Sequence, residues 1–172
     1  MKWLTCKSRL EQSDVPNKWY LLDNEVYRDE DGQIYLVPRG YLTDNYTIPD
    51  WIAWLAGCKS KFDVRPSHIH DFGCQYHQLI RVVLSERDLK RKGYLRCNED
   101  GKVVCEDIPV KYLSLVPVTK WEIDCLFKRA MKATGKISAW TYSLYRSGVF
   151  FNIGWLGDHP PYDLTKIYNE TI

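Results

Sequence analysis

The residues best suited to chemistry gather at positions 67–78, SHIHDFGCQYHQ, a stretch that holds three of the chain's four histidines. A neutral imidazole accepts a proton near pH 7, so His70 is a candidate general base. Such a base works best when a carboxylate holds its other ring nitrogen. Asp71 is not expected to do this, because neighbouring side chains on a helix point about 100° apart. We therefore expect the partner of His70 on another element, which leaves Asp71 free to bind a divalent cation through oxygen.

Asp124 is the carboxylate that best fits the role of partner. It lies in residues 119–135, TKWEIDCLFKRAMKATG, where Thr119 and Glu122 predict a capping box and Gly135 predicts a helix stop. The expected apolar face of this helix consists of Ile123, Leu126, Phe127, Ala130 and Met131. Asp124 projects beside that face, so it can meet a side chain from a helix packed there.

The histidine-rich stretch itself is predicted to be a helix over residues 66–80. Its core-facing stripe would consist of Ile69, Phe72, Tyr76, Leu79 and Ile80. His70, Cys74 and His77 share a neighbouring stripe, which leaves open a zinc site or a nucleophilic Cys74. His68 and His77 are otherwise expected at the surface or beside the site. A further alternative is that the polar cluster is only a structural hydrogen-bonding network.

The remaining elements predict an α+β fold with N-terminal antiparallel β hairpins packed on three to four helices. The turn EDG separates two strand-like runs within residues 18–38, and TIPDWIAWLAG, at 47–57, reads as a short helix. A hairpin is expected to be inserted near residues 96–105, around a second Asp-Gly turn. The segment from 137 to 151 reads as a last helix. No linker or repeat interrupts the chain, so residues 1–172 are expected to form a single domain.

Composition excludes several classes of partner. The chain has 24 basic and 22 acidic residues, a net charge of +2, so no nucleic acid is expected to bind. Its one basic cluster, at 87–96, reads as a solvated helix end, with an anion-binding surface as the alternative. No signal peptide or transmembrane segment is expected, which points to a cytoplasmic setting. The six cysteines form no C-x-x-C motif and are expected to be reduced. Cys97 and Cys105 flank a turn, so they are the pair to check for a disulfide.

The motif HDFG, followed later by DCLFKRAM, resembles the prokaryotic branch of the phospholipase A-two family. The resemblance implies that His70 activates water, that Asp124 orients His70 and that Asp71 ligates calcium. The chain departs from that family at Cys74, where a tyrosine normally follows HDFG, and in lacking the glycine-rich calcium loop.

A longer resemblance, over roughly residues 18–157, is to the bacteriophage family catalogued as domain of unknown function 1353. It rests on GYLTDNYTIPDWIAWLAG, HIHDFGCQYH and the segment that begins EIDCLFKRAM, with an insertion at 82–117. The resemblance implies a phage or prophage origin, and with it a location in the host cytoplasm or the virion, but no settled activity. It also makes Asp44 a candidate third carboxylate of the site.

These observations lead to a phage-encoded hydrolase as the main functional hypothesis. His70 and Asp124 would activate water against an ester, with a phospholipid as one substrate, and Asp71 and Asp44 would hold a divalent cation, calcium or zinc. The alternative is a non-catalytic virion or accessory protein, acting in assembly or on a host protein, whose His/Asp cluster is structural. A small phage protein that binds and inhibits a host protein is a third possibility. The sequence leaves oligomeric state open.

Overall fold

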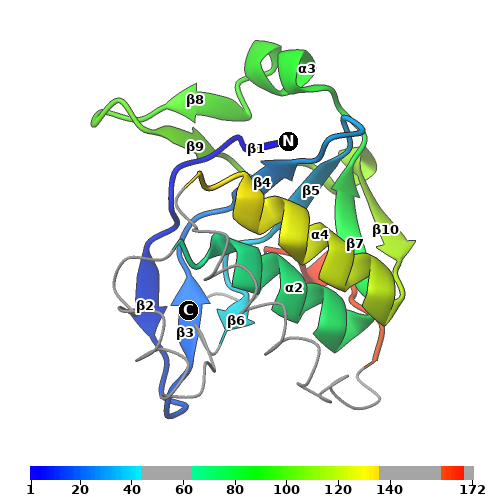
Figure 1. Ribbon diagram of the computed structural model, residues 1–172. Helices are drawn as coiled ribbons and strands as arrows, with labels where there is room; N and C mark the ends of the chain where they lie inside the picture. Colours follow the sequence, from blue (N-terminus) through cyan, green and yellow to red (C-terminus); the bar gives the residue numbers. More distant parts are fainter. Residues whose placement is uncertain (44–62, 136–159, 169–172) are drawn as a thin grey trace.

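The computed structural model describes residues 1–43, 63–135 and 160–168, and Figure 1 shows how their elements are arranged. The strands are β1 (Lys2–Trp3), β2 (Leu10–Gln12), β3 (Trp19–Leu21), β4 (Glu25–Arg28), β5 (Ile34–Val37), β6 (Leu42–Thr43), β7 (Gln78–Val82), β8 (Leu95–Cys97), β9 (Val103–Cys105) and β10 (Leu113–Pro117). The helices are α2 (Arg65–Tyr76), α3 (Glu86–Arg91) and α4 (Lys120–Lys132), with 3-10 turns η2 (Val110–Tyr112) and η3 (Leu164–Lys166).

The centre of the molecule is a five-stranded antiparallel sheet in the order β1-β4-β5-β7-β10. Helix α2 packs on β5 and β7, and α4 packs against α2, so both helices lie on one side of this sheet (Figure 1). The core between these layers is closed by fully buried apolar side chains, among them Val26, Leu36, Phe72, Ile80 and Ile123. Burial of these side chains is the main term that holds the helix pair in place.

Two smaller sheets complete the described part of the chain. Strands β2, β3 and β6 form one, and β8 and β9 form a hairpin around Gly101, which adopts a positive φ of 72°. A positive φ is readily adopted only by glycine or asparagine, so the Asp-Gly signal in the sequence marks this turn.

The fold class expected from the sequence is wrong. The described residues are mostly β-sheet, in three sheets with ten strands and only three short helices, and not hairpins packed on three to four helices. The reason is strand length: strands of two to five residues are too short to show a clear alternation of apolar and polar side chains.

The helix predicted over 66–80 is also too long. Helix α2 ends at Tyr76, His77 adopts a left-handed conformation with φ 54°, and Gln78 already begins β7. Leu79 and Ile80 do face the core, but they do so from a strand. By contrast, the helix with the Thr119/Glu122 capping box is confirmed, and its five predicted apolar residues are all buried.

Several expectations concern residues that the structure does not describe or does not pair. The segments 47–57 and 137–151 lie outside the described residues. Cys97 and Cys105 are free thiols, since Cys97 lies opposite Val103 and Cys105 lies opposite Leu95. Within the described ranges, none of the helices has the length and apolar character needed to cross a bilayer.

Candidate functional site

The sheet brings the two predicted site helices together. Strands β7 and β10 pair in register from Gln78 opposite Pro117 to Val82 opposite Leu113. Helix α2 runs directly into β7, and β10 runs directly into α4, so the two helices leave the same end of adjacent antiparallel strands. A hydrogen bond of 3.0 Å from the Val118 amide to the His77 carbonyl joins the two junctions. The helices must therefore lie side by side and run in opposite directions.

This junction explains why His70 meets Asp124. His70 precedes His77 by seven residues and Asp124 follows Val118 by six. At 1.5 Å per residue these offsets place the two side chains roughly 10 Å and 9 Å from the junction, at nearly the same height. The Nε2 atom of His70 lies 3.0 Å from the Oδ1 atom of Asp124, a normal hydrogen-bond length.

The glycine of the HDFG motif allows this close approach of the helices. A Cβ atom on Gly73 would lie 2.6 Å from the Cγ1 atom of Ile123, and still closer to its Cδ1 atom. Non-bonded carbon atoms pack at about 3.5–4.0 Å, so a larger residue at this position would have to displace the Ile123 side chain or push the helices apart. Ile123 directly precedes Asp124, so the same contact sets the spacing at the His70–Asp124 pair.

Three further groups surround the imidazole of His70. The Nδ1 atom lies 3.5 Å from the Oδ1 atom of Asp71, the sulfur of Cys74 lies 3.6 Å from Nε2, and the ring of Phe127 is 4.9 Å away, centroid to centroid. The expectation that Asp71 would not reach His70 is therefore corrected. The Cβ atoms of adjacent helical residues diverge, but the side chains turn enough for contact at the outer limit of hydrogen bonding.

Electrostatics favour a charged His70 and a charged Asp124. Burial disfavours the imidazolium, but hydrogen bonds with Asp124, Asp71 and Cys74 outweigh it and hold the pKa of His70 well above its usual value. Burial likewise raises the pKa of Asp124, but bonds from His70 and from Lys120 outweigh it and lower that pKa. At neutral pH the resting pair is therefore an imidazolium–carboxylate ion pair that Lys120 also contacts.

The cluster is covered but not sealed from solvent. The side chains of His70 and Asp124 are 13% and 16% exposed, and that of Asp71 is 31% exposed. Solvent therefore reaches the edges of the cluster, beside Asp71 and beside Lys120, which is likewise 31% exposed.

The predicted metal ligands do not assemble a metal site in the part of the chain that the structure describes. Asp71 lies beside His70, but Asp44 falls outside the described residues. No group of three or more His, Cys, Asp or Glu side chains among the described residues is arranged to hold an ion, and this includes His70, Cys74 and His77. A divalent cation at Asp71 and Asp44 stays a prediction, and no chemical step is derived through it.

The sequence missed a second histidine–carboxylate pair. His68, expected at the surface or beside the site, is fully buried, and its Nδ1 atom lies 3.0 Å from the Oε2 atom of the equally buried Glu25 in β4. Burial disfavours its charged form, but the attraction of Glu25 outweighs it and raises the pKa of His68. The pair ties α2 to the central sheet. Only the order of the strands reveals it, and no local pattern signals that order.

Comparison with known proteins identifies one family. No curated protein and no solved structure matches the chain, so the phospholipase resemblance gains no support from them. The family model described as Protein of unknown function (DUF1353) matches residues 19–147, which include α2, α4 and the strands between them. The chain therefore belongs to this family, DUF1353.

Proposed function

We propose that this protein is a hydrolase in which His70 and Asp124 activate water against an ester, and that phospholipids are the first substrate class to test. The observation that carries the proposal is the 3.0 Å contact between His70 Nε2 and Asp124 Oδ1, made between two helices whose spacing depends on a glycine. General-base catalysis requires a base, a carboxylate that orients it and a second nitrogen that a water molecule can reach, and Nδ1 of His70 lies beside the 31% exposed Asp71.

The proposal gives each group of the site a role. In the reactive state Nε2–H of His70 donates to Asp124, and Nδ1 carries the lone pair. Nδ1 takes a proton from a water molecule while the water oxygen attacks the ester carbonyl. The imidazolium then gives that proton to the departing alkoxide, which returns His70 to the neutral form. Asp124 keeps the ring in the required tautomer and stabilises its transient charge.

The raised pKa of His70 sets the pH dependence of this reaction. Only neutral His70 can accept a proton, and Asp124, Asp71 and Cys74 favour the protonated form. Turnover should therefore rise with pH through the raised pKa of His70 and be low in mildly acidic solution. A hydrolase whose rate peaks below about pH 6, where even an ordinary histidine is mostly protonated, would be inconsistent with His70 as the base.

The proposal is tested by hydrolysis of short-chain esters and of phospholipid vesicles across the pH range. His70→Gln should lower the rate by about 100-fold or more, the usual contribution of a general base. Asp124→Asn should lower the maximal rate and move the pH profile to lower pH, because it removes a group that favours imidazolium. Asp88→Asn, on the exposed α3, is the matched control and should leave the rate unchanged.

Two results would contradict the proposal. One is wild-type protein that hydrolyses no ester or phospholipid at any pH. The other is ester hydrolysis that His70→Gln leaves intact in protein whose circular dichroism spectrum is native. A melting shift with calcium or zinc ions that Asp71→Asn abolishes would add the predicted divalent cation to the site.

The second candidate function is a non-catalytic phage virion or accessory protein in which the cluster is structural. Its supporting observation is the His68–Glu25 pair, which uses the same groups on the same helix with no exposed surface. If this candidate is right, the His70–Asp124 ion pair only stabilises the packing of α4 against α2. His70→Gln would then lower the melting temperature substantially, and no ester would be hydrolysed by the wild type.

A further inference from the structure

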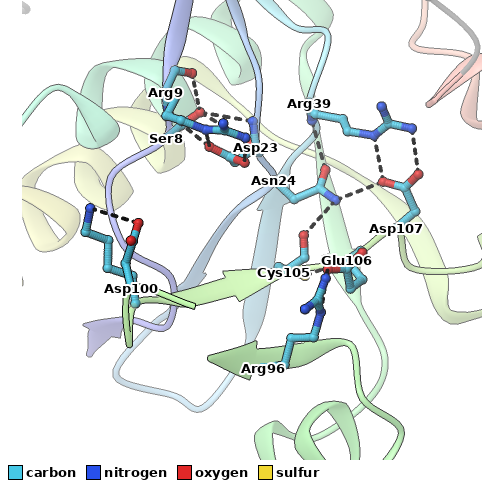
Figure 2. Close-up of polar contacts among 11 residues, drawn as sticks. Ser8, Arg9, Asp23, Asn24, Arg39, Arg96, Asp100, Cys105, Glu106 and Asp107 are labelled. Carbon is cyan, nitrogen blue, oxygen red and sulfur yellow. Dashed lines mark hydrogen bonds and ion pairs between the residues drawn. The ribbon is translucent and has the colours of Figure 1, made fainter. Parts of the chain in front are cut away.

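A polar cleft lies apart from the His70 site and has no part in the proposed hydrolysis. It encloses about 460 Å³ and is lined by the segment after β1, the turn before β4, Arg39 and the β8–β9 hairpin, and by no residue of α2 or α4. Figure 2 shows the polar contacts among side chains from these separate segments. The volume falls within the range of about 300–1,000 Å³ typical of small-molecule sites.

The lining of the cleft carries an excess of positive charge. Its basic residues are Lys7, Arg9, Arg39, Arg96 and Lys102. Against these five stand three lining carboxylates and Asp100, whose carboxylate lies 3.7 Å from the Nζ atom of Lys102, so basic groups outnumber acidic ones by one. The thiol of Cys105 does not reduce this excess, because burial, followed by the charges of Glu106 and Asp107, raises its pKa to about 12.

The three arginines are held in place by the three carboxylates. Arg9 forms two bonds of 3.1 Å with Asp23, and Arg39 forms bonds of 2.8 and 2.7 Å with Asp107. Arg96 in the same way bonds Glu106 at 2.7 Å. A guanidinium has five N–H donors, and each pair engages only one edge of it. The carboxylates thus orient the guanidinium groups without using all of their donors.

A buried amide fixes the floor of the cleft. Asn24 is 2% exposed, and its Nδ2 atom donates to the Asp107 carboxylate and to the Cys105 carbonyl, both at 3.2 Å. Its Oδ1 atom accepts a 2.8 Å bond from the Arg39 amide. Arg39 also lies over the ring of Tyr168, at 5.7 Å. Contacts at the backbone amide, at one edge of the guanidinium and at the guanidinium face therefore hold Arg39 in place. Because this side chain is already ordered, it loses less conformational entropy when a ligand binds.

We propose that this cleft binds the phosphate group of a phosphomonoester. Such a group carries a charge of about −1.5 to −2 at neutral pH, which suits a cleft with an excess of basic groups, and it offers three strong acceptor oxygens. Arginine forks suit these oxygens geometrically. The polar lining fits a small charged ligand better than an apolar one. The phosphate could belong to a soluble phosphomonoester or to a lipid headgroup such as that of phosphatidic acid.

The test measures binding by the intact protein. Isothermal titration with inorganic phosphate and with glycerol 3-phosphate reports the soluble source, and co-sedimentation with phosphatidylcholine vesicles, with and without phosphatidic acid, reports the lipid source. Arg39→Gln and Arg96→Gln should each weaken binding by about 10-fold or more, as expected for the loss of a charge-assisted hydrogen bond. Arg91→Gln is the control, because Arg91 is also an exposed, ion-paired arginine but lies on α3, outside the lining. It should leave binding unchanged.

The outcomes separate the two sources and can overturn the proposal. Binding of glycerol 3-phosphate indicates a soluble ligand, and binding only to vesicles with phosphatidic acid indicates a lipid headgroup. Failure of every phosphate probe to bind, or an equal loss in Arg91→Gln, would overturn the proposal. So would tighter binding of the dicarboxylate succinate than of glycerol 3-phosphate. Because His70 and Asp124 are not in the cleft, loss of ester hydrolysis leaves this result unaffected, and the reverse also holds.

Discussion

The close approach at Gly73 yields the sharpest test of the helix pair. Gly73→Ala would place a Cβ atom 2.6 Å from Ile123 Cγ1, about 1 Å closer than carbon atoms pack. Ile123 is fully buried, so its side chain has little room to move away. Overpacking of this kind costs about 1–3 kcal/mol. Alanine is preferred over glycine in a helix interior by about 1 kcal/mol, which offsets part of that cost. We expect a net loss of up to about 2 kcal/mol in the free energy of unfolding.

A substitution at the other side of this contact, Ile123→Ala, gives a second measurement of it. Ile123→Ala alone removes both clashing atoms and should cost about 2–5 kcal/mol, the usual effect of emptying a core position. In that background Gly73→Ala meets no clash, keeps its helix preference and fills part of the cavity. It should therefore stabilise the Ile123→Ala protein by about 1 kcal/mol. The effect of one substitution thus changes sign with the residue it faces.

Urea unfolding of the four proteins, followed by circular dichroism, measures this cycle. We expect a coupling energy of about 1–3 kcal/mol between the two positions, as found for residues in contact. If Gly73→Ala stabilised the otherwise unchanged protein, or if the two effects added to within about 0.5 kcal/mol, the helices would not be in the contact described. In addition, if the proposed hydrolysis is observed, Gly73→Ala should lower it by moving Asp124 away from His70.

Three further predictions concern the groups that anchor these helices. Arg129→Met should lower the free energy of unfolding in urea by about 3 kcal/mol, because it leaves the 2% exposed Asp29 carboxylate without its ion pair. A loss below about 1 kcal/mol would mean that this ion pair contributes little to stability. Thr119→Ala should cost about 1 kcal/mol through loss of the capping box, and Thr119→Ser should restore most of it. Glu25→Gln tests the raised pKa of His68. The pair's stabilisation is complete below about pH 6.5 and is lost as pH rises through the raised pKa, so the stability difference between wild type and Glu25→Gln should shrink as pH rises above about 6.5. A difference that stays constant or grows over that range would contradict the assignment.

The sequence predicted those elements whose ends are set by interactions between residues close together in the chain. The capping box at Thr119 and Glu122 places the start of α4 correctly, because its hydrogen bonds form within three residues. The Asp-Gly turns mark the β4–β5 and β8–β9 hairpins for the same reason. The pairing of His70 with Asp124 was inferred from helix faces and matches the observed contact, although their proposed chemistry is a separate matter.

Features that depend on long-range pairing could not be predicted in this way. The end of α2 at His77 carries no glycine or proline, so the helical spacing of Leu79 and Ile80 was extended into a strand. That strand exists because β5 and β10 flank it on both sides. The phosphate cleft likewise combines segments far apart in the chain. Of its arginines, the sequence drew attention only to Arg96, as part of a basic cluster expected to be solvated.

The pairing of β7 with β10 separates two parts of this molecule that could change independently. Main-chain hydrogen bonds between His77 and Val118 and between Val83 and Tyr112 lie at the two ends of this strand pair. Residues 83–112 therefore form an excursion from the sheet whose first and last residues are held next to each other. Shortening or lengthening it costs little loop entropy and does not move α2 or α4. A single residue inserted inside α4 just before Asp124, by contrast, would turn Asp124 by about 100° away from the helix face that meets His70. Relatives without the excursion would lose much of the arginine-lined cleft while keeping the paired helices, so the two proposed activities can be gained or lost separately in descent.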